Sequence, residues 1–571
     1  MRCKTKVLDK GYFICFVCHE NGGKVKMIVR DLFLIIAIIF TILFGMGLRI
    51  RKVTNDKWNM VYALPAILSV VHFFISNRNP FMYLVYFAAV LELLLIFLHR
   101  KKGLQRFISV ISIFIAVIPW VLTVLTNSNC YMSLGYVDAF TAFHEDMKEH
   151  YALQAWKETD FDEKFEEYIS MFEEAEQKHD KTAYISAMLS YLASYQDGHV
   201  QLWDMYENFG VGSTRNIQNT YAKIYKNYYG MTLIQLDSGE YVAANVEKDS
   251  SADLAGITDG TIITKWNGTD IAEQLKQIAY IIPVNCFMFA DTDNIERFKP
   301  FFLSCIGEEQ VNVSFVDKQG TVHNVTLDSM GNGYPYLYKT IGLFLQKEAC
   351  TGEDLRYCTL ENGIGYLQVY GMGDEYNEIR AQIVEYISQM KQDKITSLII
   401  DVRNNQGGAD DAGVIISEQF AKENIFYLKE TTYDVASGEY IENRTLEMEA
   451  KDSIDVPIYL LVNSNCISAG EGFAYNMAKL PQVTVVGIQG TNGSFGTIDG
   501  IDLMPEGMMG VYPSIACLDE NGEVMIDSKT NGTGGIKPEI TIPIDKESVI
   551  KIFEEEYDYE LEYLIRNVIE K

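Results

Sequence analysis

The stretch I-Y-L-L-V-N-S-N-C-I-S-A-G-E-G, from Ile458 to Gly472, decides the fold of the C-terminal half of this chain. Its apolar run, Ile458–Val462, leads into small and polar residues and then into a helical pattern. This order predicts a strand, a turn and a helix, with Ser468 at the start of the helix. A serine in such a turn presents its hydroxyl as a nucleophile, and the Ala469 amide is placed to donate to an oxyanion. The same residues also suit an ordinary helix N-cap, and the stretch alone does not separate the two interpretations.

Two further stretches have the pattern of strands that end in glycine. Ser397–Gly408, S-L-I-I-D-V-R-N-N-Q-G-G, is an apolar strand followed by a polar loop that closes on Gly407 and Gly408. Paired glycines let the backbone approach a ligand and expose its amides. Gly363–Met372, G-I-G-Y-L-Q-V-Y-G-M, alternates like a strand and also ends at a glycine.

A histidine lies at a third junction. In Leu192–Leu202, L-A-S-Y-Q-D-G-H-V-Q-L, a helical pattern ends at Asp197-Gly198-His199 and a strand-like pattern begins. The chain has only 8 histidines in 571 residues, so His199 at this corner is a candidate general base. The alternative is a histidine that only satisfies a turn.

Strands and helices alternate through residues 340–545, which predicts an α/β sheet with crossover helices. The expected elements are strand Gly363–Tyr370, helix Asn377–Met390, strand Ile395–Asp401, helix Ala409–Phe420, strand Ile458–Val462, helix Ser468–Leu480 and strand Val483–Gly487.

Taken in order, these motifs resemble the tail-specific, or C-terminal processing, serine peptidases, whose fold relatives include the tricorn protease core. The motifs are Asp197-Gly198-His199, Gly363-Ile364-Gly365-Tyr366-Leu367, Asp401–Gly408 and Ser468-Ala469-Gly470-Glu471. The resemblance spans roughly residues 140 to 545. It implies a crotonase-like ββα-type core, with Ser468 as nucleophile and His199 as general base. The amides of Ala469, Gly407 and Gly408 would form the oxyanion hole.

One departure from the family pattern concerns the base. The better-known branch activates its serine with a lysine about 25 residues downstream, but Gly487–Thr497 contains no lysine. The resemblance is therefore to the tricorn-like branch, which uses a histidine, a serine before it and a late glutamate. Here Gly198 replaces that serine, and no glutamate precedes Gly534–Glu539 in the expected place. The group that orients His199 stays unassigned, because Asp197 is too close along the chain to be assumed.

Two domains are expected between the membrane region and the core. Residues 127–225 have helical periodicity and resemble the family's helical lead-in. Residues 226–328 resemble a PDZ domain, in which Tyr229-Gly230-Met231-Thr232-Leu233 would hold a peptide's terminal carboxylate. A β-domain used only for packing is the alternative. Ala272–Gly307 is long for a PDZ domain and suggests an inserted lid. Residues 546–571 read as one amphipathic C-terminal helix.

Four apolar stretches near the start predict four transmembrane helices within residues 32–126, after a tail over 1–31 that includes an alternative start at Met27. Glu92 is the one acid within them and marks either packing or a functional site. The stretches are Leu32–Leu48, Trp58–Ile75, Pro80–Leu98 and Phe107–Leu125.

The distribution of charge separates a basic N-terminal region from an acidic remainder and predicts how the chain is oriented in the membrane. Residues 1–126 hold 16 Lys/Arg against 5 Asp/Glu, a balance of +11. The whole chain has a net charge of −29, so the residues after 126 have a net charge of −40. This acidity argues against nucleic acid as a partner. Arg49–Lys57 and Arg100–Arg106 carry four basic residues each, which places these two loops in the cytoplasm and both termini outside. The sequence thus predicts a multi-pass protein of the cell membrane with an extracytoplasmic catalytic domain.

Cysteines leave several options open. Seven of the ten lie beyond the membrane region, and Cys350 with Cys358 or Cys286 with Cys305 are candidate pairs. Cys466 is a conceivable nucleophile, although the family register favours Ser468.

Three functions compete at this stage. The first is a membrane-anchored serine endopeptidase that cuts protein tails or unfolded segments outside the cytoplasm. The second is an inactive peptide-binding or sensor protein that keeps the fold. The third places the function in the four helices, which lack the broken, charged helices of a transporter. A protein or peptide is the expected partner, and no metal or cofactor is implied.

Overall fold

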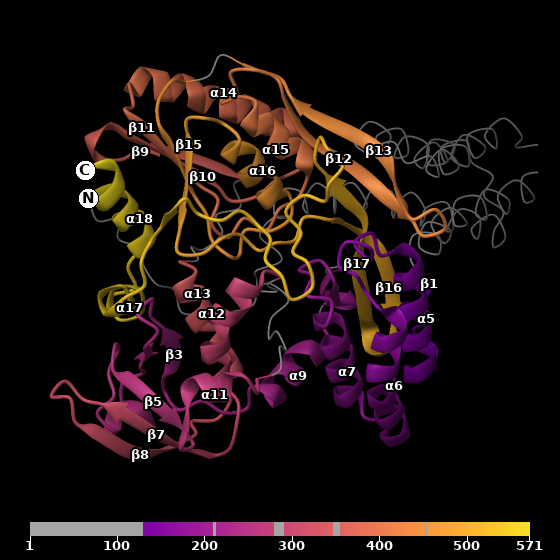
Figure 1. Ribbon diagram of the computed structural model, residues 1–571, viewed down its shortest axis with the longest axis vertical. Coiled ribbons are helices and arrows are strands. Elements are labelled where there is room, and N and C mark those ends of the chain that lie inside the picture. Colours follow the sequence, from indigo (N-terminus) through magenta and orange to yellow (C-terminus); the bar gives the residue numbers. More distant parts are fainter. Residues whose placement is uncertain (1–128, 209–212, 279–289, 347–353, 452–453) are drawn as a thin grey trace, which may run out of the picture. The chain divides into compact units, whose positions relative to one another are not determined.

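The computed structural model describes residues 129–571 except 209–212, 279–289, 347–353 and 452–453 (Figure 1). The four predicted membrane spans therefore lie outside the described residues. Within the described ranges, no helix combines the length and apolar character needed to cross a bilayer. Tyr131–Lys571 form one unit by their internal contacts, and the fold described below is that of this unit.

The C-terminal half of the described chain is built on a six-stranded sheet with the order β18-β15-β14-β11-β10-β9. Its first five strands are parallel, and β9 pairs antiparallel with β10 at one edge. The strands are β9 (Leu355–Thr359), β10 (Ile364–Val369), β11 (Ser397–Asp401), β14 (Ile458–Leu461), β15 (Val483–Gly487) and β18 (Ile540–Thr541). The predicted succession of strands and helices is confirmed here.

Both faces of this sheet are buried, which explains why its strands are continuous apolar runs. Leu398 and Ile400 face three helices, while Ile399 between them faces a second hydrophobic core. The three helices pack side by side on the first face (Figure 1). They are α14 (Tyr376–Asp393), α15 (Asp410–Ser417) and α16 (Ala469–Ala478).

A second sheet contains the strand that follows the candidate base. Strand β17 pairs antiparallel with both β2 and β16 at Met508–Val511 and with β12 at Ala516–Leu518. Strand β12 also pairs with β13 to make a long hairpin (Figure 1). The bounds are β2 (Gln201–Asp204), β12 (Ile425–Asp434), β13 (Glu439–Met448), β16 (Thr497–Met504) and β17 (Met508–Leu518); the two-residue β1 is Asn129–Cys130. The sequence analysis did not predict β12, β13, β16 or β17.

The predicted helical lead-in is present. Phe161, Phe172, Ile185, Met188 and Leu192 are buried in one aromatic-rich core, as their helical spacing indicated. The helices are α5 (Tyr136–His150), α6 (Phe161–Lys178), α7 (Lys181–Ala193), α8 (Met205–Asn208) and α9 (Asn216–Ile224).

The described residues of 229–278 and 290–328 form a small β domain with a sheet and a hydrophobic core of its own. Its sheet order is β3-β4-β5-β7-β8, with β6 paired to β5, so β3 is an edge strand. The strands are β3 (Thr232–Gln235), β4 (Tyr241–Ala244), β5 (Ile262–Trp266), β6 (Thr269–Asp270), β7 (Gln310–Val316) and β8 (Val322–Asp328). The helices are α10 (Ser251–Leu254), α11 (Ile271–Leu275), α12 (Thr292–Leu303) and, after the domain, α13 (Tyr334–Phe344).

The prediction of one C-terminal helix is wrong. Helix α17 (Lys546–Phe553) ends, and α18 (Tyr559–Tyr563) begins after an N-cap in which the Asp558 side chain accepts from the Leu561 amide. A π-helix, Leu564–Ile569, follows. The break places Asp558 and Glu560 beside Arg403 of the core, with which both carboxylates pair.

Candidate active site

Ser468 lies in a strained turn between β14 and α16. Its φ of 61° and ψ of −139° are unusual for a residue with a side chain, and such strain is found at functional sites. Ser468 is the N-cap residue of α16 by position, but its side chain makes no capping hydrogen bond, so the hydroxyl is not used to cap the helix. The residue is half-buried, and its amide donates to the Ser494 carbonyl at 2.9 Å. The strained strand-to-helix turn has the backbone character of a nucleophile elbow.

The Gly407-Gly408 turn lies directly against this serine. Strands β11 and β14 are parallel neighbours, so the loops at their carboxyl ends meet at one edge of the sheet. A Cβ added to Gly407 would lie 2.5 Å from the Ser468 Cβ and 2.8 Å from the Ala469 nitrogen. Only glycine, with its φ of 86°, allows this approach.

The three amides that were expected to donate to an oxyanion differ in whether they already have an acceptor within the protein. The Gly407 amide donates to Oδ1 of Asn405 at 2.9 Å, so it is occupied within the protein. The amides of Gly408 and Ala469 donate to no acceptor among the described residues. Gly408 is also exposed. The amides of Gly408 and Ala469 are therefore the two of the three that have no acceptor within the described residues, while Gly407 makes room for the serine turn.

Asn405 is a buried residue that the sequence analysis did not single out. Its side chain accepts from Gly407 and donates to the Val369 carbonyl at 2.9 Å, while its own carbonyl accepts from the Ile467 amide at 3.0 Å. It therefore connects the end of β10, the glycine turn and the serine turn. A side-chain amide in a glycine-rich loop after a strand was the available signal.

His199 lies in the turn between α7 and β2, as predicted, and is buried. A Cβ on the preceding Gly198 would lie 2.6 Å from Cδ1 of Ile467, the residue before Ser468. The turns that carry the candidate base and the candidate nucleophile are therefore in contact. Burial lowers the pKa of His199, and Asp197 only partly opposes this, so the imidazole is neutral at physiological pH.

No described residue hydrogen-bonds to Nδ1 of His199, which is buried. Oδ1 of Asp197 lies 4.0 Å from it, too far for a hydrogen bond. Asp197 is instead held by other donors: the His199 amide at 2.8 Å and the Tyr151 hydroxyl at 2.7 Å. The carboxylate is thus close to the imidazole ring and fixed, although the ring is not bonded to it.

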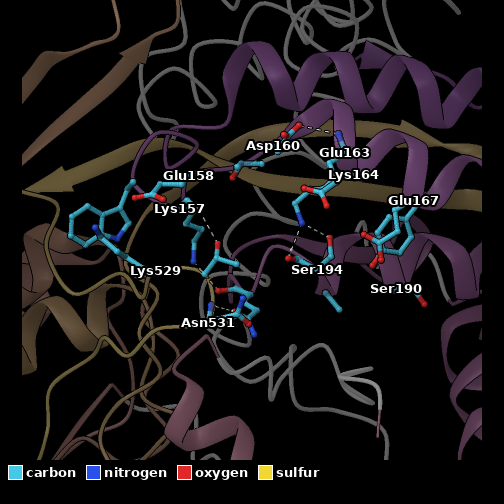
Figure 2. Close-up of a pocket in the computed structure, with 16 residues that line it drawn as sticks. Lys157, Glu158, Asp160, Glu163, Lys164, Glu167, Ser190, Ser194, Lys529 and Asn531 are labelled. Carbon is cyan, nitrogen blue, oxygen red and sulfur yellow. Dashed lines mark hydrogen bonds between the residues drawn. The ribbon is translucent and has the colours of Figure 1, made fainter. Parts of the chain in front are cut away.

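A pocket of about 670 Å³ is lined in part by the chain that precedes this turn, including Ser194 and Gln196 (Figure 2). Lys157, which is buried, donates to the carbonyls of Gln196 at 2.9 Å and Ser528 at 2.7 Å. Lys164 donates to Ser194, and burial lowers the pKa of Lys164 to about 8. Ser468 does not line this pocket, whose residues instead anchor the backbone before Asp197.

Arg403 connects the loop that leads to Gly407 with the C-terminal segment. Its guanidinium, buried in the core, bonds to the carboxylates of Asp401, Asp558 and Glu560. The Tyr366 hydroxyl donates to Asp401 at 2.8 Å. This network holds the start of the loop that leads to Gly407.

The five residues expected to capture a peptide carboxylate, Tyr229-Gly230-Met231-Thr232-Leu233, lie at the start of β3 and are all buried. They lie in the small β domain, apart from the serine turn along the sequence. Helix α12 lies against β3: Nη1 of Arg297 donates to the Gln235 carbonyl at 2.9 Å.

The structure bears on both roles that were considered for the cysteines, a nucleophile at Cys466 and disulfide bonds. The thiol of Cys466 is buried in the hydrophobic core, and burial raises its pKa well above the usual value, which does not suit a nucleophile. Cys305 and Cys358 have no disulfide partner among the described residues, and Cys286 and Cys350 lie outside them. No group of three His, Cys, Asp or Glu in the described ranges has the arrangement of metal ligands.

Comparison with known proteins finds a family whose model is similar to the part of the chain that contains Ser468. Residues 363–542 match the model of peptidase family S41. The matched residues form a domain that is similar to S41 serine peptidases. The domain includes Ser468, Gly407 and Gly408, whereas His199 lies outside the matched residues.

Parts of the chain are also similar to individual known proteins. A carboxy-terminal-processing protease of Bartonella bacilliformis is 24% identical over 235 residues, which are 39% of this chain and 47% of that protein. The match thus spans about half the length of this relative. Among solved structures, mature CPAF complexed with lactacystin is 11% identical, with 76% of this chain and 99% of that chain covered at a TM-score of 0.48. The photosystem II D1 C-terminal processing protease is 14% identical, with 73% and 96% covered at a TM-score of 0.32.

Proposed function

We propose that this protein is a serine endopeptidase in which Ser468 is the nucleophile and His199 the general base. One observation carries the proposal. Ser468 lies at a strained strand-to-helix turn, against Gly407 and in contact with the turn of His199. Strain at a half-buried serine, with free amides beside it, has no role in packing but suits acyl transfer.

The reaction follows from these positions. His199, neutral because burial lowers its pKa, takes the proton of the Ser468 hydroxyl as the oxygen attacks a peptide carbonyl. The amides of Ala469 and Gly408 donate to the oxyanion that forms. His199 then protonates the leaving amine, and water hydrolyses the acyl-enzyme by the same route in reverse.

The substrate we infer is a protein tail or an unfolded segment. The Bartonella bacilliformis relative is named a carboxy-terminal-processing protease. In this chain the edge strand β3 is the proposed peptide-binding element, in the manner of a PDZ domain, with the Tyr229–Leu233 segment at its start. An extended substrate would add a strand to β3 and leave its terminal carboxylate near Gly230.

We place the peptidase domain outside the cytoplasm of a membrane-anchored protein. The support comes from the sequence: four apolar stretches within residues 32–126, and basic residues concentrated in two of their connecting loops. The acidity of the remainder of the chain suits a soluble domain that is kept off an anionic membrane surface.

A peptide-binding protein without catalysis is the second candidate. The observation that favours it is Nδ1 of His199, which has no hydrogen-bond partner in the described part of the chain. A base without an orienting partner retains reduced activity, as removal of the third triad residue does elsewhere.

Proteolysis by the full-length chain in detergent tests the proposal. An unfolded protein is incubated with the parent, Ser468→Ala and His199→Ala, and the products are read by mass spectrometry. Both variants are expected to lose at least about 1000-fold of the parent's rate. Ser464→Ala is the matched control, because the Ser464 hydroxyl is buried in the same turn without a hydrogen-bond partner.

The outcomes separate the candidates. Cutting that survives Ser468→Ala excludes Ser468 as nucleophile. A parent that binds peptides tightly and cuts none of them supports the peptide-binding candidate instead.

A further inference from the structure

Ser494 contacts both halves of the candidate active site. Its carbonyl accepts from the Ser468 amide at 2.9 Å. Its hydroxyl accepts from the Gly198 amide at 2.7 Å and donates to Oδ1 of Asp197 at 3.3 Å. A single fully buried residue therefore bonds the serine turn on one side and the histidine turn on the other.

The loop that carries Ser494 is itself fixed by the helix behind the nucleophile. Glu471, three residues after Ser468 on α16, is fully buried and accepts from the amides of Gly493 at 2.7 Å and Ser494 at 2.8 Å. Phe495 adds a bond from its amide to Asp527 at 3.0 Å. Ser494 cannot move without breaking these bonds, so its hydroxyl has a defined position.

The fit between Ser494 and Gly198 is close. A Cβ on Gly198 would lie 3.1 Å from the Cβ of Ser494 and 2.8 Å from Oδ1 of Asn492. The space in front of Gly198 is therefore filled from the 492–494 loop. A hydroxyl that residue 198 lacks is supplied from across the site by Ser494.

This hydroxyl also determines where the Asp197 carboxylate lies. Oδ1 of Asp197 accepts from Ser494 and from the His199 amide, and Oδ2 accepts from Tyr151. The carboxylate is held 4.0 Å from Nδ1 of His199. Without the Ser494 hydroxyl, a buried amide and a buried carboxylate oxygen would each lose a partner, which favours displacement of the turn.

We propose that Ser494 is a positioning residue, whose hydroxyl holds the Asp197-Gly198-His199 turn against the Ser468 turn. The inference deepens the proposed function and rests on it. Ser494 does not touch the reacting atoms; it acts through Gly198 and Asp197 on the orientation of His199.

The test compares Ser494→Ala with Ser528→Ala in the full-length chain. Ser528 is a matched control, because its hydroxyl is equally buried and has no hydrogen-bond partner among the described residues. Two quantities are measured: kcat and KM for a peptide, and the pKa of His199 by NMR of 15N-histidine-labelled protein. The His199 signal is assigned by its absence in His199→Gln.

In Ser494→Ala we expect kcat to fall about 10- to 100-fold with KM within about twofold, since misplacement of a catalytic group costs rate more than binding. The pKa of His199 is expected to rise toward its ordinary value, because a displaced turn is better solvated. Ser528→Ala is expected to match the parent in both quantities. Equal behaviour of the two variants overturns the proposal.

Two further experiments cover the cases in which Ser494→Ala does not fold or the parent cuts no peptide. If Ser494→Ala does not fold, Ser494→Cys fills nearly the same space with a weaker hydrogen-bonding group and is expected to give the same changes in smaller measure. Parent-like values in that variant overturn the proposal. If the parent cuts no peptide, the proposed function fails, and the His199 titration alone decides whether Ser494 positions the turn.

Discussion

His199 is the proposed general base, and two features of its surroundings shift its pKa in opposite directions. Burial lowers its pKa, while the carboxylate of Asp197 raises it by a smaller amount. The net effect keeps the imidazole neutral down to a pH below its ordinary pKa of about 6.5. The ring is therefore ready to accept a proton from Ser468 across the physiological range.

The pH dependence of catalysis follows from this balance. We expect kcat/KM to be level near neutral pH and to fall about tenfold per pH unit below the pKa of His199. In Asp197→Asn the attraction to the protonated ring is lost, so the acid limb is expected to move to lower pH. A profile of kcat/KM against pH with one peptide measures both, and Asp138→Asn, an exposed change, is the control. An acid limb that moves to higher pH in Asp197→Asn would contradict the assignment.

At the scale of elements, the sequence predicted what local pattern determines. The buried parallel strands β10, β11, β14 and β15 are short apolar runs, and their loops end in the glycines and the serine that the motifs indicated. Strand β13, by contrast, is largely exposed and reads E-Y-I-E-N-R-T-L-E-M, without an apolar face. Strand β17 contains Gly510 and Pro513, two residue types that are uncommon inside strands, so its sequence does not indicate a strand. The role of Ser494 could not be predicted, because only contacts between distant segments place it beside Ser468 and Gly198.

Helix α12 is the element that joins the small β domain to the site. At its N-terminal end, Asn294 donates to the Thr491 carbonyl at 2.7 Å, in the loop that leads to Ser494. Toward its C-terminal end, Ser304 lies 3.2 Å from the hydroxyl of Thr232 on β3. Arg297 between them bonds to the Gln235 carbonyl. One helix therefore contacts both the proposed peptide-binding strand and the active-site loop.

Arg297 occupies an acceptor on the strand that a bound peptide would use. We expect Arg297→Ala to bind a peptide about 3- to 10-fold more tightly, since a hydrogen bond contributes about 0.5–1.5 kcal/mol net. Fluorescence anisotropy with a labelled peptide that ends in a free carboxylate measures this. Lys299→Ala is the control, because Lys299 pairs with Glu296 on the same helix. Weaker binding in Arg297→Ala would show that the guanidinium contributes to the peptide site instead of competing for it.

At the scale of the whole molecule, the site draws on segments that lie far apart in the chain. The pairing of β2 with β17 brings residues 201–204 beside 508–511 and so carries His199 to the core. The C-terminal segment adds Asp558 and Glu560 to Arg403, five residues before Gly408. Three carboxylates around one guanidinium leave an excess of negative charge in a buried place. Burial accordingly raises the pKa of Glu560 to about 7, although Arg403 opposes the rise.

This raised pKa makes the C-terminal contact sensitive to pH in a defined direction. Because the folded protein holds a proton on Glu560 that the unfolded chain releases at a lower pH, the stability from this group is present at acidic pH and is lost as the pH rises toward 7. Glu560→Gln removes the proton exchange and keeps the side chain's size. We expect its free energy of unfolding, relative to the parent, to increase by on the order of 1–3 kcal/mol between pH 5 and pH 7.5 and to level off above.

Urea unfolding of the full-length chain at several pH values, followed by circular dichroism, measures this difference. Glu555→Gln, an exposed change five residues earlier, is the control and should track the parent at every pH. A difference that decreases with pH would mean that Glu560 is ionised in the fold and that Arg403 needs its charge. In that case the C-terminal segment would be held to the active-site loop by the ion pair itself, and acid would release it.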